Sequence, residues 1–184
     1  AVRRGLSRPG DMLVFLPGMA EIRRAEKALQ GISELDVFAL HGDLSREEQQ
    51  AALGPSARRK VILATNIAET SLTLPGITTV IDSGLHRQAA HSWWSGVPTL
   101  KTKKISKASA EQRAGRAGRV AAGHCVRLYP KFDLDTRPAF DLPELQRADL
   151  AQTLLELLTL DIVDFATLPW LETPPPAAVQ AALQ

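Results

Sequence analysis

The densest cluster of cationic side chains lies in the segment QRAGRAGR, residues 112–119. Read as a helix, this segment places Gln112, Arg116 and Arg119 on one face, at positions i, i+4 and i+7. Its two glycines destabilise such a helix by about 1 kcal/mol each relative to alanine, and clustered cations repel one another unless an anion is bound. A guanidinium group presents a rigid fork of donors that matches phosphate oxygens. The segment therefore predicts a phosphate-binding face.

Arg113 differs from the other two arginines of this segment. It points about 100° away from the face that carries Gln112, because an α-helix has about 3.6 residues per turn. We therefore expect Arg113 to form a structural ion pair. A basic helix that binds nucleic acid or forms salt bridges is the alternative for the segment as a whole.

Charge is unevenly distributed along the chain, although the formal net charge is only +2. Residues 1–85 carry ten basic and ten acidic side chains. Residues 86–119 carry eight basic side chains and one acidic side chain, and residues 120–184 carry four basic and nine acidic ones. A basic block inside a nearly neutral protein indicates a polyanionic partner. A solvated basic face is the alternative.

Composition indicates an ordinary globular protein of 184 residues, 45% hydrophobic and 23% charged, long enough for one domain and an appendage. No apolar run approaches the ~20 residues of a membrane span, and no signal-peptide pattern is present. We therefore expect a cytoplasmic protein with no membrane partner.

Cys125 has no partner for an internal disulfide, and its apolar surroundings predict a buried thiol. The spacing of His86, His91 and His124 is not that of metal ligands, so no metal site is expected.

Short apolar runs alternate with helical patterns in the first half of the chain. The expected strands are residues 12–16, 35–40, 60–64 and 77–82, and the expected helices are residues 20–30 and a segment that follows Ser45. Ser45 and Glu48 have the spacing of a capping box. This alternation predicts a parallel sheet with helices on both faces. Such sheets bind ligands at the carboxyl ends of their strands, where Thr65–Asn66 and Ser83–Gly84 are expected to lie.

Residues 85–107 interrupt this alternation and read as two extended runs around residues 95–98, which predicts a β-hairpin. Trp93 and Trp94 precede the turn; they either stack on bases or pack the hairpin onto a neighbouring domain. Lysines follow the turn, and they either track phosphates or are simply solvated. These lysines are Lys101, Lys103 and Lys104.

The last part of the chain has a different character. A final strand is expected over residues 125–129. Pro143 is acceptable in the first turn of a helix, and the leucines between 145 and 158 predict a helix with a wide apolar stripe. We place domain boundaries so that residues 1–10 are a linker, residues 11–132 are the α/β domain and residues 133–184 open a further helical region too short for a complete second core.

The sequence resembles the DEAH/RHA group of superfamily 2 helicases over roughly residues 10 to 184. QRAGRAGR at 112–119 is similar to motif VI of that group, ATNIAETSLT at 64–73 to motif V, and VFLPG at 14–18 followed by Glu21–Ile22 to motif IV. Within the group the chain is most similar to the bacterial HrpB-like branch. The resemblance implies the second RecA-like lobe of an ATP-dependent helicase, followed by the opening of a winged-helix region, and it implies a hairpin inserted between motifs V and VI.

The resemblance also implies roles for individual residues in ATP hydrolysis. Arg116 matches an arginine finger, Arg119 a second contact to the γ-phosphate, and Gln112 the residue that orients the attacking water. Ser71 and Thr73 match positions that face the nucleotide.

A second set of residues matches positions that contact nucleic acid. Thr65 and Asn66 match contacts to the nucleic-acid backbone, although a capped strand-to-helix turn would also use such residues. Gly18 matches a point of close phosphate approach, and a plain turn is the alternative there. The hairpin lysines complete the expected nucleic-acid contacts.

The sequence contains neither a GxxxxGK[ST] phosphate loop nor an Asp-Glu-Ala-His box. We therefore expect ATP and Mg²⁺ to be bound chiefly by an upstream RecA-like lobe, and we expect these 184 residues alone to be inactive. The expected partner is single-stranded nucleic acid, RNA in preference to DNA. Two alternatives remain: a catalytically silent nucleic-acid-binding module and a double-stranded DNA translocase.

Overall fold

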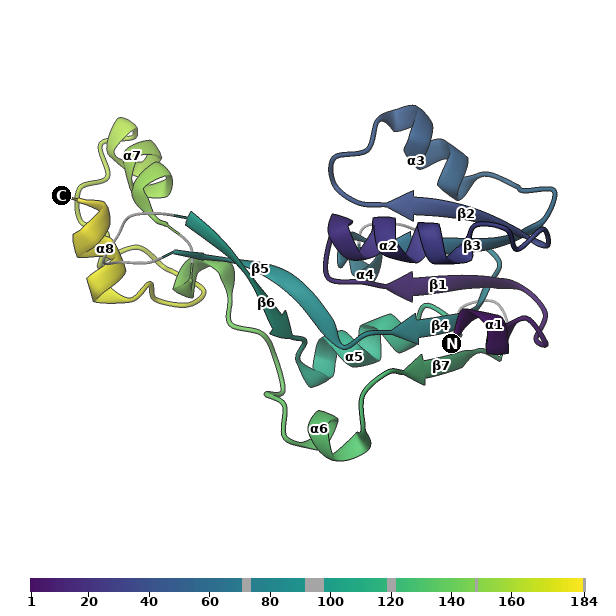
Figure 1. Ribbon diagram of the computed structural model, residues 1–184. Helices are drawn as coiled ribbons and strands as arrows, with labels where there is room; N and C mark the ends of the chain where they lie inside the picture. Colours follow the sequence, from purple (N-terminus) through teal and green to yellow (C-terminus); the bar gives the residue numbers. More distant parts are fainter. Residues whose placement is uncertain (71–73, 92–97, 119–121, 148, 184) are drawn as a thin grey trace. The chain divides into compact units, whose positions relative to one another are not determined.

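The computed structural model describes residues 1–70, 74–91, 98–118, 122–147 and 149–183. Its centre is a five-stranded sheet in the order β2-β3-β1-β4-β7, in which every neighbouring pair is parallel (Figure 1). The strands of this sheet are β1 (Asp11–Phe15), β2 (Leu35–Leu40), β3 (Arg59–Ala64), β4 (Ile77–Asp82) and β7 (His124–Arg127). The expected parallel sheet is confirmed, and the strand boundaries agree with the sequence patterns to within a few residues.

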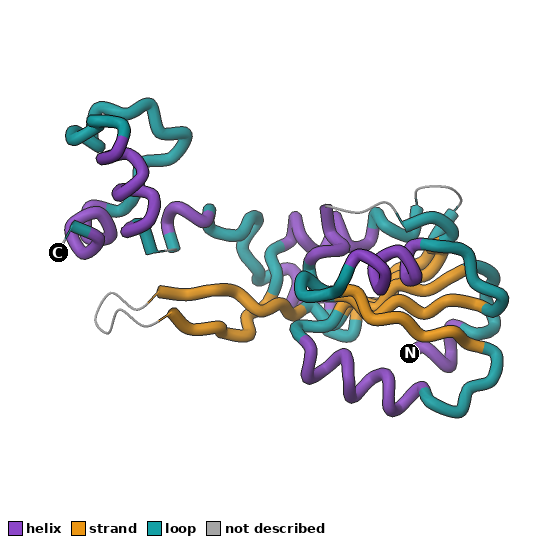
Figure 2. The backbone as a smooth tube through the Cα atoms, turned by 90° about the horizontal axis from the view of Figure 1, so that it is seen from above, coloured by secondary structure: helices purple, strands orange, loops and turns teal. Residues whose placement is uncertain are grey.

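Helices cover both faces of this sheet (Figure 2). The helices of the first 114 residues are α1 (Val2–Gly5), α2 (Met19–Leu29), α3 (Arg46–Leu53), α4 (Ile67–Thr70) and α5 (Lys107–Ala114). Successive residues of a strand point to opposite faces, so Leu13 and Phe15 pack with residues of α3 and α4, whereas Met12 and Val14 pack with α1 and α2.

Local sequence signals account for the ends of α3. The Ser45 side chain accepts a hydrogen bond from the backbone N–H of Glu48, and the Glu48 carboxylate accepts one from the backbone N–H of Ser45, as the capping box predicts. At the other end, the Lys60 ammonium donates to the carbonyls of Ala52 and Gly54 at 3.2 and 2.7 Å. This buried lysine thereby satisfies carbonyls that a helix end leaves without partners.

Strands β5 (Leu85–His91) and β6 (Pro98–Lys104) form a separate two-stranded antiparallel pair, which confirms the expected hairpin strands. The expected turn and Trp93 and Trp94 lie outside the described residues. The remaining helices are α6 (Lys131–Asp135), the 3-10 helix η1 (Glu144–Gln146), α7 (Ala151–Thr159) and α8 (Pro176–Ala182).

The chain divides into two compact units. The first contains residues 1–87 and 102–141, and the second contains residues 88–101 and 142–184. The first unit continues past residue 132 because Arg137 and Asp141 hydrogen-bond to residues near the base of the hairpin. Residues 1–10 are also part of it, since Val2 and Leu6 pack against its core. The second unit has its own small core around Leu150, Leu154 and Phe165.

Two expectations for segments outside motif VI are wrong. The leucine-rich segment after Pro143 is not one helix, because the chain forms a 3-10 turn at residues 144–146 and begins α7 only at Ala151. Cys125 is exposed and not buried. It lies on β7, an edge strand whose residues are all exposed, so an apolar strand pattern at a sheet edge did not produce burial.

Substitution of Gly84 by alanine should destabilise the first unit strongly. Gly84 has a φ of +72°, and an added Cβ would lie 2.4 Å from the Tyr129 ring and 2.8 Å from an Arg137 nitrogen. The left-handed conformation costs a non-glycine residue about 1–2 kcal/mol, and overpacking adds about 1–3 kcal/mol. Urea unfolding should therefore show a loss of about 2–5 kcal/mol for Gly84→Ala.

Gly42→Ala is the matched control, because Gly42 is exposed and nothing lies within 4 Å of its added Cβ. We expect a change within about 0.5 kcal/mol there. Equal effects at both glycines would contradict the packing of Tyr129 and Arg137 against Gly84.

Candidate nucleotide and nucleic-acid site

The carboxyl edge of the sheet brings two of the sequence motifs together. β3 ends at Ala64, and its next two residues lead directly into α4. Thr65 is half-buried and its backbone N–H donates to Leu40 at the end of β2, whereas Asn66 is exposed. α4 contacts α5, which carries the first part of QRAGRAGR. The short helix α4, which follows Thr65 and Asn66, therefore lies beside the helix that leads into the arginine-rich segment.

The arginine-rich segment is not one continuous helix. α5 starts after Ser106, whose hydroxyl accepts a hydrogen bond from the backbone N–H of Ser109, and it ends at Ala114. Residues 115–118 are turns. The prediction that Gln112, Arg116 and Arg119 share one helical face is therefore wrong for Arg116, and Arg119 lies outside the described residues. The glycines at 115 and 118 terminate the helix, consistent with their low helix propensity.

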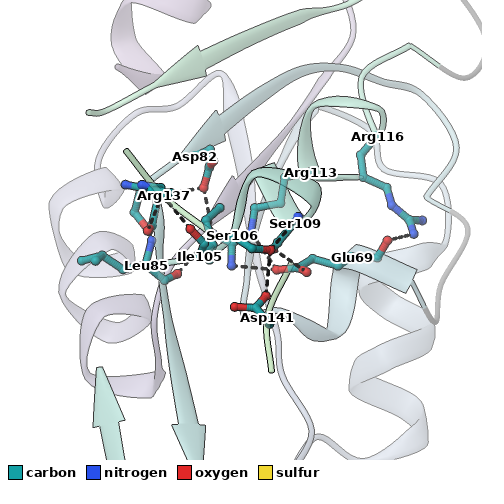
Figure 3. A network of polar contacts seen from close by, with 12 residues as sticks. Glu69, Asp82, Leu85, Ile105, Ser106, Ser109, Arg113, Arg116, Arg137 and Asp141 are labelled. Atoms are coloured by element: carbon teal, nitrogen blue, oxygen red, sulfur yellow. Dashed lines mark hydrogen bonds and ion pairs between the residues drawn. The ribbon is translucent and has the colours of Figure 1, made fainter. Parts of the chain in front are cut away.

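Arg113 lies at the centre of a buried ionic network (Figure 3). Its side chain is 0% exposed and contacts two carboxylates, Glu69 at 2.7 Å and Asp82 at 2.7 Å. It also donates to the carbonyl of Leu85 at 3.1 Å. Its guanidinium carbon lies 4.7 Å from the centre of the Phe15 ring, within the range of a cation–π interaction. The expected structural ion pair of Arg113 is confirmed.

Arg116 is also buried, at 5% relative exposure, but it makes a different contact. Its guanidinium donates to the main-chain carbonyl of Glu69, in the last turn of α4 (Figure 3). Gln112, in contrast, is exposed on α5. Arg113 and Arg116 thus have different surroundings, because Arg113 contacts two carboxylates and Arg116 donates to a main-chain carbonyl.

Asp82 connects this network to the base of the hairpin. It is fully buried, and its carboxylate accepts hydrogen bonds from Tyr129 at 2.6 Å and from the backbone N–H of Gly84 at 2.9 Å. Burial raises the pKa of the Tyr129 phenol, and its hydrogen bond to Asp82 raises that pKa further, so Tyr129 remains a donor. Arg137 lies over the Tyr129 ring and donates to the carbonyls of Gly84 and Ile105, which flank the hairpin.

The predicted nucleic-acid contacts have varied surroundings. Gly18 lies against Arg87, since an added Cβ would be 2.9 Å from that side chain's Nε atom. The three lysines of β6 are all exposed, and Lys104 forms an ion pair with Asp133. Hydrogen bonds from Lys104 and Arg137 lower the pKa of Asp133, which favours the charged form of this carboxylate. The three exposed lysines of β6 are Lys101, Lys103 and Lys104.

Ser71 and Thr73, the expected nucleotide contacts of motif V, lie outside the described residues. Among the residues that the structure describes, no group of three or more histidine, cysteine or carboxylate side chains is placed to hold a metal ion. Within the same residues no helix is long and apolar enough to cross a membrane.

A family model described as the helicase conserved C-terminal domain matches residues 2–121, well over half of the chain. The chain belongs to this helicase C-terminal domain family. The expected membership of the superfamily 2 helicases is therefore confirmed.

Relatives place this helicase domain within the DEAH group. It is 40% identical over 173 residues to a protein from Haemophilus influenzae that is described as an ATP-dependent RNA helicase HrpA homolog. The aligned region covers 93% of this chain and 13% of that relative. HrpA of Escherichia coli, described as an ATP-dependent RNA helicase, is 41% identical with the same coverage. The crystal structure of the Escherichia coli DEAH/RHA helicase HrpB matches with a TM-score of 0.91 and 39% identity, over 99% of this chain and 24% of that chain.

These matches confirm the RecA-like fold and the likeness to HrpB. They also show that this helicase domain spans about an eighth of the HrpA relatives and about a quarter of the HrpB chain. The matched region is one part of a longer protein in each case. The winged-helix assignment of the last residues stays a prediction.

Sequence reasoning about this helicase domain overlooked two carboxylates, Glu69 and Asp82. Glu69 lies inside motif V and Asp82 at the end of β4. One signal was available for Asp82: it is the last residue of an apolar strand, and a carboxylate that is buried with its strand needs a cationic partner. Glu69 had no comparable signal, because a glutamate in a short helix is most often solvated.

Proposed function

We propose that this chain is the second RecA-like lobe of an ATP-dependent RNA helicase of the DEAH type. The observation that carries the proposal is the joining of motifs V and VI by Glu69 and Arg113, which fixes the arginine-rich turn beside the carboxyl edge of the sheet. The relatives described as ATP-dependent RNA helicases support the same assignment. The full-length protein would hydrolyse ATP in response to RNA and move along one strand.

In this proposal Arg116 is the arginine finger. It stabilises negative charge on the oxygens of the transferring phosphoryl group, a contribution of about 10³–10⁵ in rate. Arg119 makes a second contact to the γ-phosphate, and Gln112 orients the attacking water. The exposure of Gln112 on α5 is compatible with a ligand that approaches from outside this lobe. Ser71 and Thr73 complete the contacts to the nucleotide.

The nucleic-acid contacts come from a second set of residues. Thr65 and Asn66 bind the backbone of a single strand through a hydroxyl and an amide, contacts that position a protein without reading sequence. Gly18 lies at the adjoining strand end, with the cationic Arg87 beside it. Lysines of β6 contribute salt-dependent phosphate contacts. We expect this lobe to bind single-stranded RNA in preference to single-stranded DNA.

An upstream lobe supplies the parts of the ATP site that this sequence lacks. That lobe would bind most of the ATP and hold Mg²⁺, which would neutralise the charge that develops on the phosphate oxygens. The absence of a GxxxxGK[ST] loop and of an Asp-Glu-Ala-His box from the 184 residues supports this division. It follows that these residues alone should not hydrolyse ATP. A cytoplasmic location is part of the same proposal.

The proposal is tested by steady-state ATP hydrolysis of the full-length protein, with and without single-stranded RNA, beside the 184-residue chain. We expect hydrolysis that RNA stimulates in the full-length protein and none in the chain alone. Stimulation by duplex DNA in preference to RNA would support a double-stranded DNA translocase instead. Tight RNA binding by a full-length protein without any hydrolysis would support a silent binding module.

A further inference from the structure

Glu69 contacts the arginine-rich segment through both its side chain and its main chain (Figure 3). One carboxylate oxygen accepts a hydrogen bond from Arg113 Nε at 2.8 Å and lies 2.7 Å from Arg113 Nη2 as part of the same ion pair. The other accepts a hydrogen bond from the Ser109 hydroxyl at 2.8 Å. The main-chain carbonyl of the same residue accepts a hydrogen bond from Arg116. One residue of motif V thus fixes three side chains of the motif VI region.

The position of Glu69 in its own element makes this contact set rigid. Its backbone N–H donates to the carbonyl of Asn66 at 2.9 Å, which closes the short α4 turn directly after β3. The hydrogen bond from Arg113 Nε to its carboxylate joins two charged groups and is therefore of the strong, charge-assisted kind. Because Arg113 is also bound to Asp82 at the end of β4, Glu69 is linked to β4, on the other side of β1, as well as to the end of β3.

The charge of Glu69 is therefore linked to the position of Arg116. If its carboxylate no longer held Arg113, the α4 turn would lose its ion pair with α5. The carbonyl that receives Arg116 belongs to the same residue and would move with that turn. A displacement of about 1 Å of a group that acts on a transition state can cost about 10²-fold in rate.

We propose that Glu69 is a positioning residue for Arg116, which sets the place from which that arginine reaches the transferring phosphoryl group. This inference rests on the proposed function, because it assigns Arg116 its role as a finger. Glu69 itself contacts neither ATP nor RNA. Its loss should lower kcat and leave the KM for ATP nearly unchanged, since the affected contact forms in the transition state.

The test is Glu69→Gln in the full-length protein, which keeps the shape of the side chain and removes its charge. We expect RNA-stimulated kcat to fall about 10- to 100-fold, with KM changed less than about 3-fold. Glu47→Gln is the matched control, because Glu47 is exposed in the first turn of α3 and takes part in no contact with motif VI. Its kcat should equal that of the unmutated protein.

A double-mutant cycle separates positioning from a merely structural role. In an Arg116→Ala background, single-turnover hydrolysis of labelled ATP measures the residual rate. If Glu69 acts through Arg116, Glu69→Gln should lower that residual rate by less than about 2-fold, because the residue it positions is already absent. The same fold-loss in both backgrounds, or an unchanged kcat for Glu69→Gln alone, would overturn the inference. Failure of the unmutated protein to hydrolyse ATP would instead overturn the proposed function.

Discussion

Arg116→Ala should reduce RNA-stimulated ATP hydrolysis by the full-length protein by about 10³- to 10⁵-fold, the range found when an arginine finger is removed. The structural effect should be small by comparison, because the hydrogen bond that Arg116 donates to the main-chain carbonyl of Glu69 contributes about 1.5–3 kcal/mol to stability. The affinity for single-stranded RNA should stay within about 2-fold, since the proposed RNA contacts lie in other segments.

Steady-state hydrolysis and fluorescence anisotropy with a labelled RNA measure the two quantities separately. Arg46→Ala is the control, because Arg46 is an exposed arginine at the start of α3, and both quantities should be unchanged there. A loss of RNA affinity that matches the loss of hydrolysis would show that Arg116 contacts nucleic acid and is not a finger.

Arg113→Met should destabilise the 184-residue chain by about 3–5 kcal/mol, the cost of breaking a buried ion pair by removing one partner. Methionine fills much of the same volume, so the loss arises from the carboxylates that remain. Asp82 is fully buried and would keep the donors Tyr129 and Gly84, while Glu69 would keep Ser109. The loss of the interaction with the Phe15 ring adds to the effect.

Urea unfolding followed by circular dichroism measures this loss, with the m-value as a check on two-state behaviour. The double variant Arg113→Met with Asp82→Asn provides the internal control. It should recover part of the stability lost in the single variant, because the uncompensated buried charge is gone. A single variant that loses less than about 1 kcal/mol would contradict the buried network.

The two predictions concern arginines that are three residues apart and that helical spacing already separates. The surroundings of Arg116 depend in addition on where α5 ends. A continuous helix was expected to place Gln112, Arg116 and Arg119 on one face, but the helix stops at Ala114 and Arg116 emerges from a turn. Glycines at positions 115 and 118 signalled weak helix formation. The sequence alone did not show that two such residues are enough to end the helix at that point.

The structural role of Arg113 was predictable from helical spacing, whereas its partners were not. Glu69 and Asp82 lie 44 and 31 residues before it in the chain. They become neighbours only because β3 and β4 both flank β1 and their carboxyl ends share one edge. The same holds for Cys125, since the sequence indicates a strand but not that this strand lies at the edge of the sheet.

The sequence by itself determined the alternation of strands and helices, the capped start of α3 and the identity of the motif residues. These features depend on neighbours within about ten positions, where side-chain periodicity and capping chemistry act directly. Tertiary structure alone decided that Glu69 joins motif V to both Arg113 and Arg116, and that Tyr129 and Arg137 hold the base of the hairpin. Such contacts link segments far apart in the chain, so they form only when the packing of the sheet and its helices brings their polar groups within hydrogen-bonding distance.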